Sequence, residues 1–221
     1  ISLGLVGSEM CIRDRYLGGV FYSISIGMPT SIAALIVTLQ PILTNILSGP
    51  ILNEKVTLKQ WIGVLLGFLG ATLVLGLDLG SKIPLLGLVA TLIALISITA
   101  STIWQKKLSN NLPLSVSNFY QAVGGCFFHI LVVIFFAKPY IAFTKTFLLS
   151  MGHQIFLVSF GAFTILMFLI KKNSASKTVS IFFLIPATSA LMAWFFLGET
   201  LTVIDLLGFL ITSIGVYIAT R

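Results

Sequence analysis

The stretch from Leu39 to Thr57 reads LQPILTNILSGPILNEKVT, and the stretch from Leu184 to Thr202 reads LIPATSALMAWFFLGETLT. The two stretches align without a gap, and three of their shared positions are Pro41 with Pro186, Glu54 with Glu199 and Thr57 with Thr202. The same alignment also pairs Leu52 with Leu197 within these stretches and, beyond them, Ser31 with Ser176, Gly63 with Gly208 and Gly70 with Gly215. The chain therefore repeats two consecutive apolar segments and the corner between them, and such a repeat sets the plan of a fold.

The composition places most of the chain in lipid. Hydrophobic residues make up 57% of the 221 residues, charged residues only 9%, and the mean hydropathy is +1.10, which leaves too little polar surface to cover a water-soluble globule. A helix needs about 20 apolar residues to cross a hydrocarbon core of about 30 Å. Eight runs approach this length, the first of them short: Tyr16 to Met28, Ser31 to Leu52, Gln60 to Leu77, Pro84 to Trp104, Phe119 to Ala137, Gln154 to Ile170, Thr178 to Leu197 and Leu201 to Ala219. Because these runs are unbroken rather than alternating, they favour helices over a β-barrel, and we expect an all-α integral membrane protein.

The first fifteen residues, ISLGLVGSEMCIRDR, lack an initiator Met and place four charges directly against the first apolar run. This segment resembles the translated remnant of a sequencing adapter, and we exclude residues 1–15 from fold reasoning; the alternative is a genuine cytoplasmic leader. With Cys11 excluded, Cys126 is the only native cysteine, so no intrachain disulfide is expected.

The number of apolar runs between the two copies of the repeat determines the direction in which the second copy crosses the membrane. It comes five helices after the first and so crosses the membrane in the opposite sense. Basic residues, which concentrate in cytoplasmic loops, agree with this. If the Glu54 corner is cytoplasmic, eight basic residues fall inside: Lys55, Lys59, Lys106, Lys107, Lys171, Lys172, Lys177 and Arg221. Three fall outside: Lys82, Lys138 and Lys145.

We therefore predict two inverted five-helix repeats. Residues 81–221 hold five helices, whereas residues 16–80 hold three, so that eight helices of an expected ten are present. The predicted location is the plasma (inner) membrane, with the C-terminus in the cytoplasm. The net charge of +7 lies in small clusters between apolar runs, which is a topology signal rather than a nucleic-acid surface.

A mid-helix Pro, a corner of the form Gly/Asn-Glu-x-x-Thr and a following helix with Gly at a seven-residue interval occur twice in this plan. From Tyr16 to Arg221 the chain resembles the drug/metabolite transporter superfamily, specifically the EamA type. The second copy fits the pattern most closely, while the first has Asn53 in place of Gly and an additional Pro50. The resemblance implies a secondary carrier or exporter of small metabolites that works by alternating access. Inverted repeats with interrupted helices indicate such a carrier independently.

The repeated residues have separate expected roles. Pro41 and Pro186 lack an N–H and should kink their helices, which makes them hinge candidates. Glu54 and Glu199 either favour the N-terminus of the following helix, with the nearby Thr as cap, or act as gate residues. We expect five glycines to allow close helix packing in lipid: Gly63, Gly67, Gly70, Gly208 and Gly215.

Polar groups inside apolar runs are costly and so are candidates for a solute pathway. Our main candidates are Gln40, Asn45, Trp104, Gln121 and His129, and Gln105, Tyr120 and Trp194 have a similar character. Gln40 and Asn45 rank first because they flank Pro41. His129 could carry a coupling proton, yet the apolar runs hold no mid-membrane carboxylate to pair with it. Without a fixed charge at mid-depth, the expected cargo is uncharged or zwitterionic.

No nucleophile with a base, carboxylate pair, Cys/His metal spacing or Gly-rich phosphate loop is visible, so we expect no enzyme activity, no metal and no cofactor. The expected partners are membrane lipid and a small-molecule substrate, with no nucleic acid and with a homodimer left open. The alternative function is a lipid-handling or structural membrane protein without solute transport.

Overall fold

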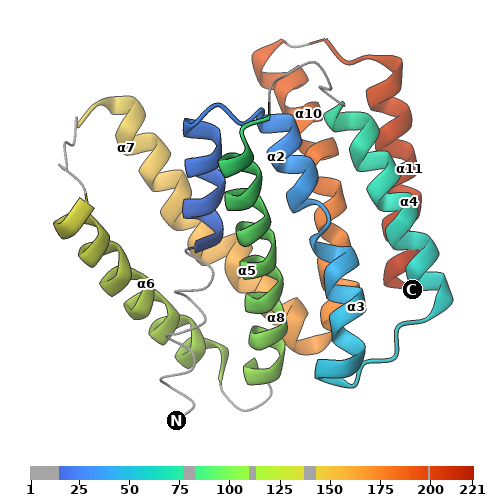
Figure 1. Cartoon of the computed structure of the whole chain (residues 1–221), viewed down its shortest axis with the longest axis horizontal. Coiled ribbons are helices and arrows are strands. Elements are labelled where there is room, and N and C mark those ends of the chain that lie inside the picture. Colours follow the sequence, from blue (N-terminus) through green and yellow to red (C-terminus); the bar gives the residue numbers. More distant parts are fainter. Residues whose placement is uncertain (1–14, 77–82, 110–112, 137–142, 199) are drawn as a thin grey trace.

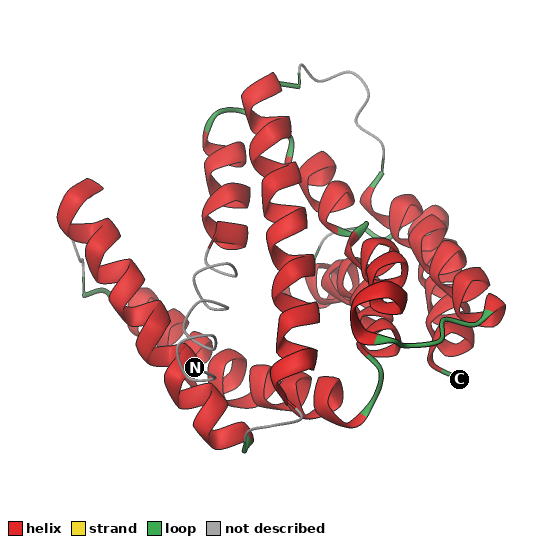
Figure 2. Ribbon diagram, turned by 60° about the horizontal axis from the view of Figure 1, so that its bottom comes forward, coloured by secondary structure: helices red, strands yellow, loops and turns green. Residues whose placement is uncertain are grey.

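The structure is a computed structural model that describes residues 15–76, 83–109, 113–136, 143–198 and 200–221. All regular secondary structure in these residues is helical (Figure 2). After a helix at residues 15–25, the elements are α2 (Thr30–Val37), α3 (Gln40–Leu52), α4 (Leu58–Leu75), α5 (Leu85–Ser109), α6 (Leu114–Phe136), α7 (Lys145–Gly152), the π-helix η1 (His153–Ala162), α8 (Phe163–Lys172), α9 (Ala175–Ser180), the 3-10 helix η2 (Ile181–Phe183), α10 (Leu184–Leu197) and α11 (Val203–Thr220). Residues 1–14, with nearly all of the suspected adapter segment, and Glu199 lie outside the described residues.

Six helical segments of the described residues are long and apolar enough to cross a membrane: Thr30–Leu52, Leu58–Leu75, Leu85–Lys107, Lys145–Lys172, Ala175–Phe196 and Val203–Thr220. They correspond to six of the eight predicted runs. The helix at residues 15–25 and α6 correspond to the other two and are not among the six. The structure corrects one boundary: the run expected from Gln154 begins at Lys145, because Thr144 caps the helix by accepting the Phe147 N–H at 3.1 Å. His153, expected in a loop, therefore lies within a continuous helical segment.

The helices form one bundle, with α6 and α7 at one edge and α4 and α11 at the other (Figure 1). Large apolar side chains cover much of its outer surface; Leu58, Phe195 and Phe196, for example, are more than 70% exposed. Such a surface suits lipid rather than water. The composition and the helix lengths together make this an integral membrane protein that crosses the bilayer several times.

Each proline-containing span is interrupted just before its proline. In the first span, α2 ends at Val37 and α3 starts at Gln40, one residue before Pro41. In the second, the 3-10 helix η2 separates α9 from α10, and Pro186 is the third residue of α10. Proline cannot donate the backbone hydrogen bond that continues an α-helix, and the first gap is bridged instead by the tighter bond from the Leu39 N–H to the Ile36 carbonyl at 3.1 Å.

The corners after α3 and α10 are built alike. α3 ends in a left-handed residue, Asn53 with φ 56°, and α10 ends in Gly198 with φ 68°. Asn tolerates this conformation better than most residues, so the Asn found in the first copy preserves the corner. Thr57 and Thr202 then cap α4 and α11, and each forms a capping box with the side chain three residues later.

These capping boxes correct one interpretation of Glu54. The acceptor at the start of α4 is Thr57, supported by Gln60. The Glu54 carboxylate instead accepts the backbone N–H of Ala175 at 2.9 Å, at the start of α9. Glu54 thus stabilises the N-terminus of a helix that is distant in sequence, not the one that follows it.

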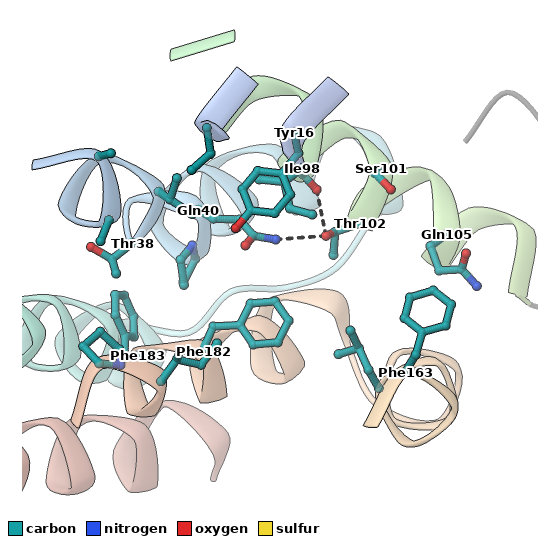
Figure 3. A pocket seen from close by; sticks show the side chains of 18 of the residues that line it. Tyr16, Thr38, Gln40, Ile98, Ser101, Thr102, Gln105, Phe163, Phe182 and Phe183 are labelled. Atoms are coloured by element: carbon teal, nitrogen blue, oxygen red, sulfur yellow. Dashed lines mark hydrogen bonds between the residues drawn. The ribbon is translucent and has the colours of Figure 1, made fainter. Parts of the chain in front are cut away.

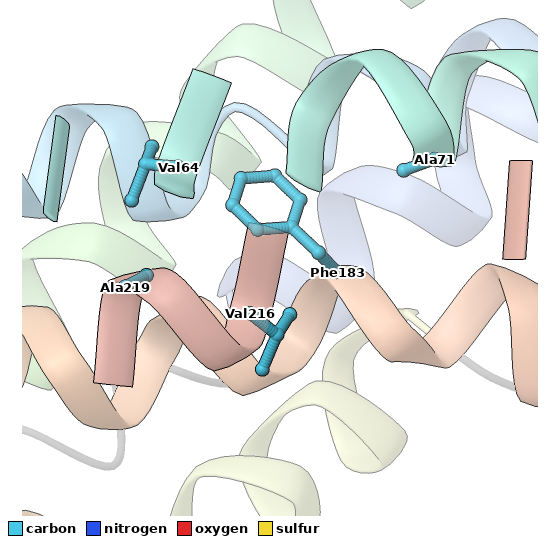
Figure 4. Close-up of a cluster of buried hydrophobic side chains, with 5 residues drawn as sticks. All are labelled: Val64, Ala71, Phe183, Val216 and Ala219. Carbon is cyan, nitrogen blue, oxygen red and sulfur yellow. The ribbon is translucent and has the colours of Figure 1, made fainter. Parts of the chain in front are cut away.

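Glycines allow α4 and α11 to touch backbone to backbone. A Cβ added to Gly63 would lie 2.6 Å from the Gly215 carbonyl oxygen, and one added to Gly70 would lie 2.6 Å from that of Gly208. A Cβ on Gly67 would lie 2.7 Å from the Phe183 ring. Phe183 is fully buried here, in a cluster with Val64, Ala71, Val216 and Ala219 (Figure 4).

Candidate functional site

A cavity of about 410 Å³ lies among α2, α3, α5, α8, η2, α10 and the helix at residues 15–25. Pro41 and Pro186, the two helix-interrupting prolines, both line it. The repeated stretches, 145 residues apart in the chain, therefore meet at one cavity. The interruptions form part of its wall, where a helix that has lost a hydrogen bond has a carbonyl available.

One wall of the cavity is polar. Gln40 on α3 is 3% exposed and donates from Nε2 to the hydroxyl of Thr102 on α5 at 3.0 Å. Thr102 in turn donates to the Ile98 carbonyl at 2.9 Å. Ser101 and Gln105 extend this wall along α5. Because a buried amide without a partner is costly in an apolar medium, the bond to Thr102 explains how Gln40 is held at this depth.

The facing wall is apolar and aromatic. Figure 3 shows Phe163, Phe182 and Phe183 across from Gln40 and Thr102. Phe163 comes from α8, while the other two come from η2, the segment that interrupts the second proline-containing span. None of the described residues that line the cavity is Asp, Glu, Lys, Arg or His. The cavity thus offers hydrogen-bonding groups on one side, apolar rings on the other and no fixed charge.

The structure separates the predicted pathway residues. Gln40 lines the cavity, whereas Asn45 does not: its side chain is buried, and its Oδ1 accepts a hydrogen bond from Ser176. Trp104 is 36% exposed and lies outside the cavity lining. Gln121 and His129 belong to α6, and their side chains lie outside the described part of the structure.

Several lining residues were not among our candidates: Tyr16, Thr38, Ser101 and Thr102. The serine and threonines gave little signal because their hydroxyls routinely bond to the preceding turn of their own helix, as Thr38 does to the Leu35 carbonyl at 2.6 Å. Gln105, which we considered only as a secondary candidate, does line the cavity. Among the described residues, no group of three or more His, Cys, Asp or Glu could hold a metal ion.

The profile of one protein family, described as the EamA-like transporter family, matches residues 16–76 and 85–221. The chain belongs to the EamA-like transporter family. This confirms the resemblance that the duplicated Pro and Glu-x-x-Thr pattern indicated. Membership makes the chain a membrane transporter component, and it gives no indication of an enzyme.

Curated relatives of this EamA-like chain include an "Uncharacterized transporter YvbV" of Bacillus subtilis (strain 168), 28% identical over 200 residues, which cover 85% of the chain and 62% of the relative. A "Probable amino-acid metabolite efflux pump" of Salmonella typhimurium is 24% identical over 97% of the chain and 75% of the relative. A solved crystal structure superimposes with a TM-score of 0.82 at 16% identity, covering 97% of the chain and 75% of the solved one. The chain thus spans from three fifths to three quarters of the length of these proteins, and the solved structure shares its fold.

Proposed function

We propose that the chain forms most of a secondary carrier that moves small uncharged or zwitterionic metabolites across a membrane by alternating access. The 410 Å³ cavity is its solute chamber. A volume between about 300 and 1,000 Å³ is usual for sites that take small molecules.

The observation that carries this proposal is the meeting of Pro41 and Pro186 at one cavity. Interrupted helices from two matching segments, facing each other around a site near mid-membrane, are typical of carriers that expose the site to each side in turn. A structural membrane protein has no need of matched interruptions.

The finer architecture is part of the same proposal. We infer two inverted repeats of five helices, supported by the similar interruptions, left-handed corners and capping boxes of the two copies. We also infer an inner-membrane location with a cytoplasmic C-terminus, supported by the uneven distribution of basic residues.

The solute class follows from the lining. Placing a net charge against a neutral wall costs much of its hydration energy, so a phosphorylated solute is disfavoured. Gln40, Ser101 and Thr102 can bond to polar groups of a solute, while Phe182 and Phe183 can cover its apolar part. Since two relatives are named probable amino-acid metabolite efflux pumps, amino acids and their neutral derivatives are the first solutes to test.

The test is counterflow into proteoliposomes with a panel of neutral, zwitterionic and phosphorylated metabolites. We expect counterflow of a neutral or zwitterionic solute and a loss of about tenfold in Gln40→Leu, because a solute group would lose its hydrogen-bonding partner. Gln154→Leu, the same change at an exposed position outside the cavity lining, is the matched control. Preference for a phosphorylated solute would contradict the solute class. Lipid scrambling without solute counterflow would favour the lipid-handling alternative.

A further inference from the structure

The end of α8 and the turn at residues 173–174, between α8 and α9, are held in place by a lysine from another helix. Lys106, in the last turn of α5, donates from Nζ to the carbonyls of Ile170 at 2.8 Å, Lys171 at 3.3 Å and Asn173 at 2.5 Å. The last carbonyls of a helix lack partners within it and carry partial negative charge. An ammonium has three N–H donors, so Lys106 suits the end of α8 in both charge and number of bonds.

The other side of the same turn is held by the corner after α3. Glu54 accepts the N–H of Ala175 at 2.9 Å and that of Ser176 at 3.5 Å, at the positive end of α9. The Ser176 hydroxyl donates to Asn45 Oδ1 on α3. Ser176 and Asn45 are 1% and 3% exposed, so this contact is dry.

These contacts lie beside the solute cavity. Ile170, whose carbonyl accepts from Lys106, lines the cavity, and so does Gln105, the residue before Lys106. Moving the α8–α9 turn away from α5 would therefore displace part of the cavity wall at this end of the bundle.

The contact between α3 and α9 also leaves one polar group without a hydrogen bond among the described residues, which costs free energy. Asn45 Nδ2 is buried and has no hydrogen-bond partner in the described part of the structure. A buried donor without a partner is unfavourable, and water would reach it if α3 and α9 separated. Water would likewise hydrate the freed carboxylate and ammonium. Separating the α8–α9 turn from α3 and α5 thus replaces strong hydrogen bonds with hydration of the same groups. This compensation keeps the free-energy difference small, as a contact that opens and closes repeatedly requires.

We propose that Lys106, Glu54 and Asn45 form a clamp on the α8–α9 turn, and that this clamp is the gate at this end of the cavity. The proposal rests on the alternating-access function proposed above. In each cycle the three contacts break together when solute passes this end of the bundle and form again when the opposite end opens.

The test measures access to the cavity and requires no known solute. In full-length chain lacking Cys11 and Cys126, the variant Ser101→Cys places a thiol on the cavity wall, and a membrane-impermeant maleimide is added to one face of reconstituted vesicles at a time. The exposed Lys107, changed to Cys in a separate sample, identifies the face that carries the clamp. Lys106→Met should raise the labelling rate from that face by roughly tenfold or more, since hydrogen bonds to a charged group are strong.

Lys107→Met removes the same charge one residue away and is the matched control, for which we expect no change. Equal labelling rates in folded Lys106→Met and Lys107→Met would overturn the proposal. Should Lys106→Met fail to fold, the double variant Asn45→Cys/Ser176→Cys gives a second test. Oxidation should lower labelling from the clamp face by about tenfold, in keeping with strong contacts at the closed gate, and reduction should restore it. Unchanged labelling after complete cross-linking would overturn the clamp, whatever the counterflow experiment shows.

Discussion

The helices α3 and α10 have matching backbones in different surroundings. Both follow an interruption, carry a proline near their start and end in a left-handed residue. Yet α3 buries Gln40, Thr44 and Asn45, whereas α10 exposes 52% of Trp194 and 72% of Phe195. The repeated residues therefore determine the local backbone, while the neighbouring helices, α5 and α9 for α3, determine which side chains are buried.

The largest loss of stability is expected at the contact between α4 and α11, the helices that follow α3 and α10. Gly215→Leu would place a side chain against the backbone of Gly63 and Gly67 on α4, and overpacking of this kind costs about 3 kcal/mol or more. We expect a large fall in the thermal unfolding temperature in detergent micelles. Gly152→Leu, at a helical glycine with open space around it, should not lower that temperature. A similar loss there would contradict the claim that the close contact between α4 and α11 is what makes Gly215→Leu destabilising.

The prolines come next. Pro41→Ala with Pro186→Ala would restore the missing N–H groups and allow both spans to continue as α-helix. We expect the initial counterflow rate to fall about tenfold, equivalent to about 1.4 kcal/mol, with folding retained. Pro50→Ala is the control on the same α3 helix, because Pro50 is exposed, lies outside the cavity lining and has no counterpart in α10. Unchanged flux in the double variant would refute the hinge role.

The two capping boxes should contribute equally to the free energy of unfolding. Thr57→Ala and Thr202→Ala each remove the acceptor for the first backbone N–H groups of α4 and α11, at a cost of about 1 kcal/mol. Thermal unfolding of the single variants measures this. Thr72→Ala, which loses only a bond to the Phe68 carbonyl of its own helix, is the control. A clear difference between Thr57→Ala and Thr202→Ala would mean that the two corners are alike in geometry only.

The smallest effect is expected from exchanging the corner residues. Asn53→Gly and Gly198→Asn should each change the unfolding free energy by no more than about 0.5 kcal/mol, because both residues accept left-handed backbone. Gly198→Val, with a β-branched side chain at φ 68°, should cost about 1–2 kcal/mol. Equal unfolding temperatures for Gly198→Asn and Gly198→Val would contradict the left-handed corner.

The helices and their interruptions were predictable because both depend on local sequence. The apolar runs predicted the membrane-spanning helices, and Pro41 predicted an interruption near the boundary between α2 and α3. The position of Gln40 beside the cavity agrees with its selection as a candidate, which rested on the cost of an amide in an apolar run. The start at Lys145 was missed because its signal, the cap at Thr144, lies between two apolar runs, in a segment that we interpreted as a loop.

Long-range contacts were not predictable. The partner of Glu54 lies 121 residues away at Ala175, and nothing near Glu54 in sequence indicates it. The same holds for Asn45: its polarity marked it as important, but only the packing of α3 on α9 places it beside Ser176 rather than in the cavity. Trp104 is 36% exposed and lies outside the cavity lining, which was not predictable because a helix with apolar residues all round gives no signal for which of its sides faces the cavity.

The Phe183 ring contacts both the cavity and the α4–α11 core. This position offers a way to find solutes that does not depend on a transport assay. Its ring lines the cavity and also fills the space left by Gly67 in the α4–α11 core. A compound that fixes the ring from the cavity side also steadies the backbone of α4. Slower deuterium uptake by α4 amides would then report cavity occupancy, so a compound library can be screened by mass spectrometry on the purified chain.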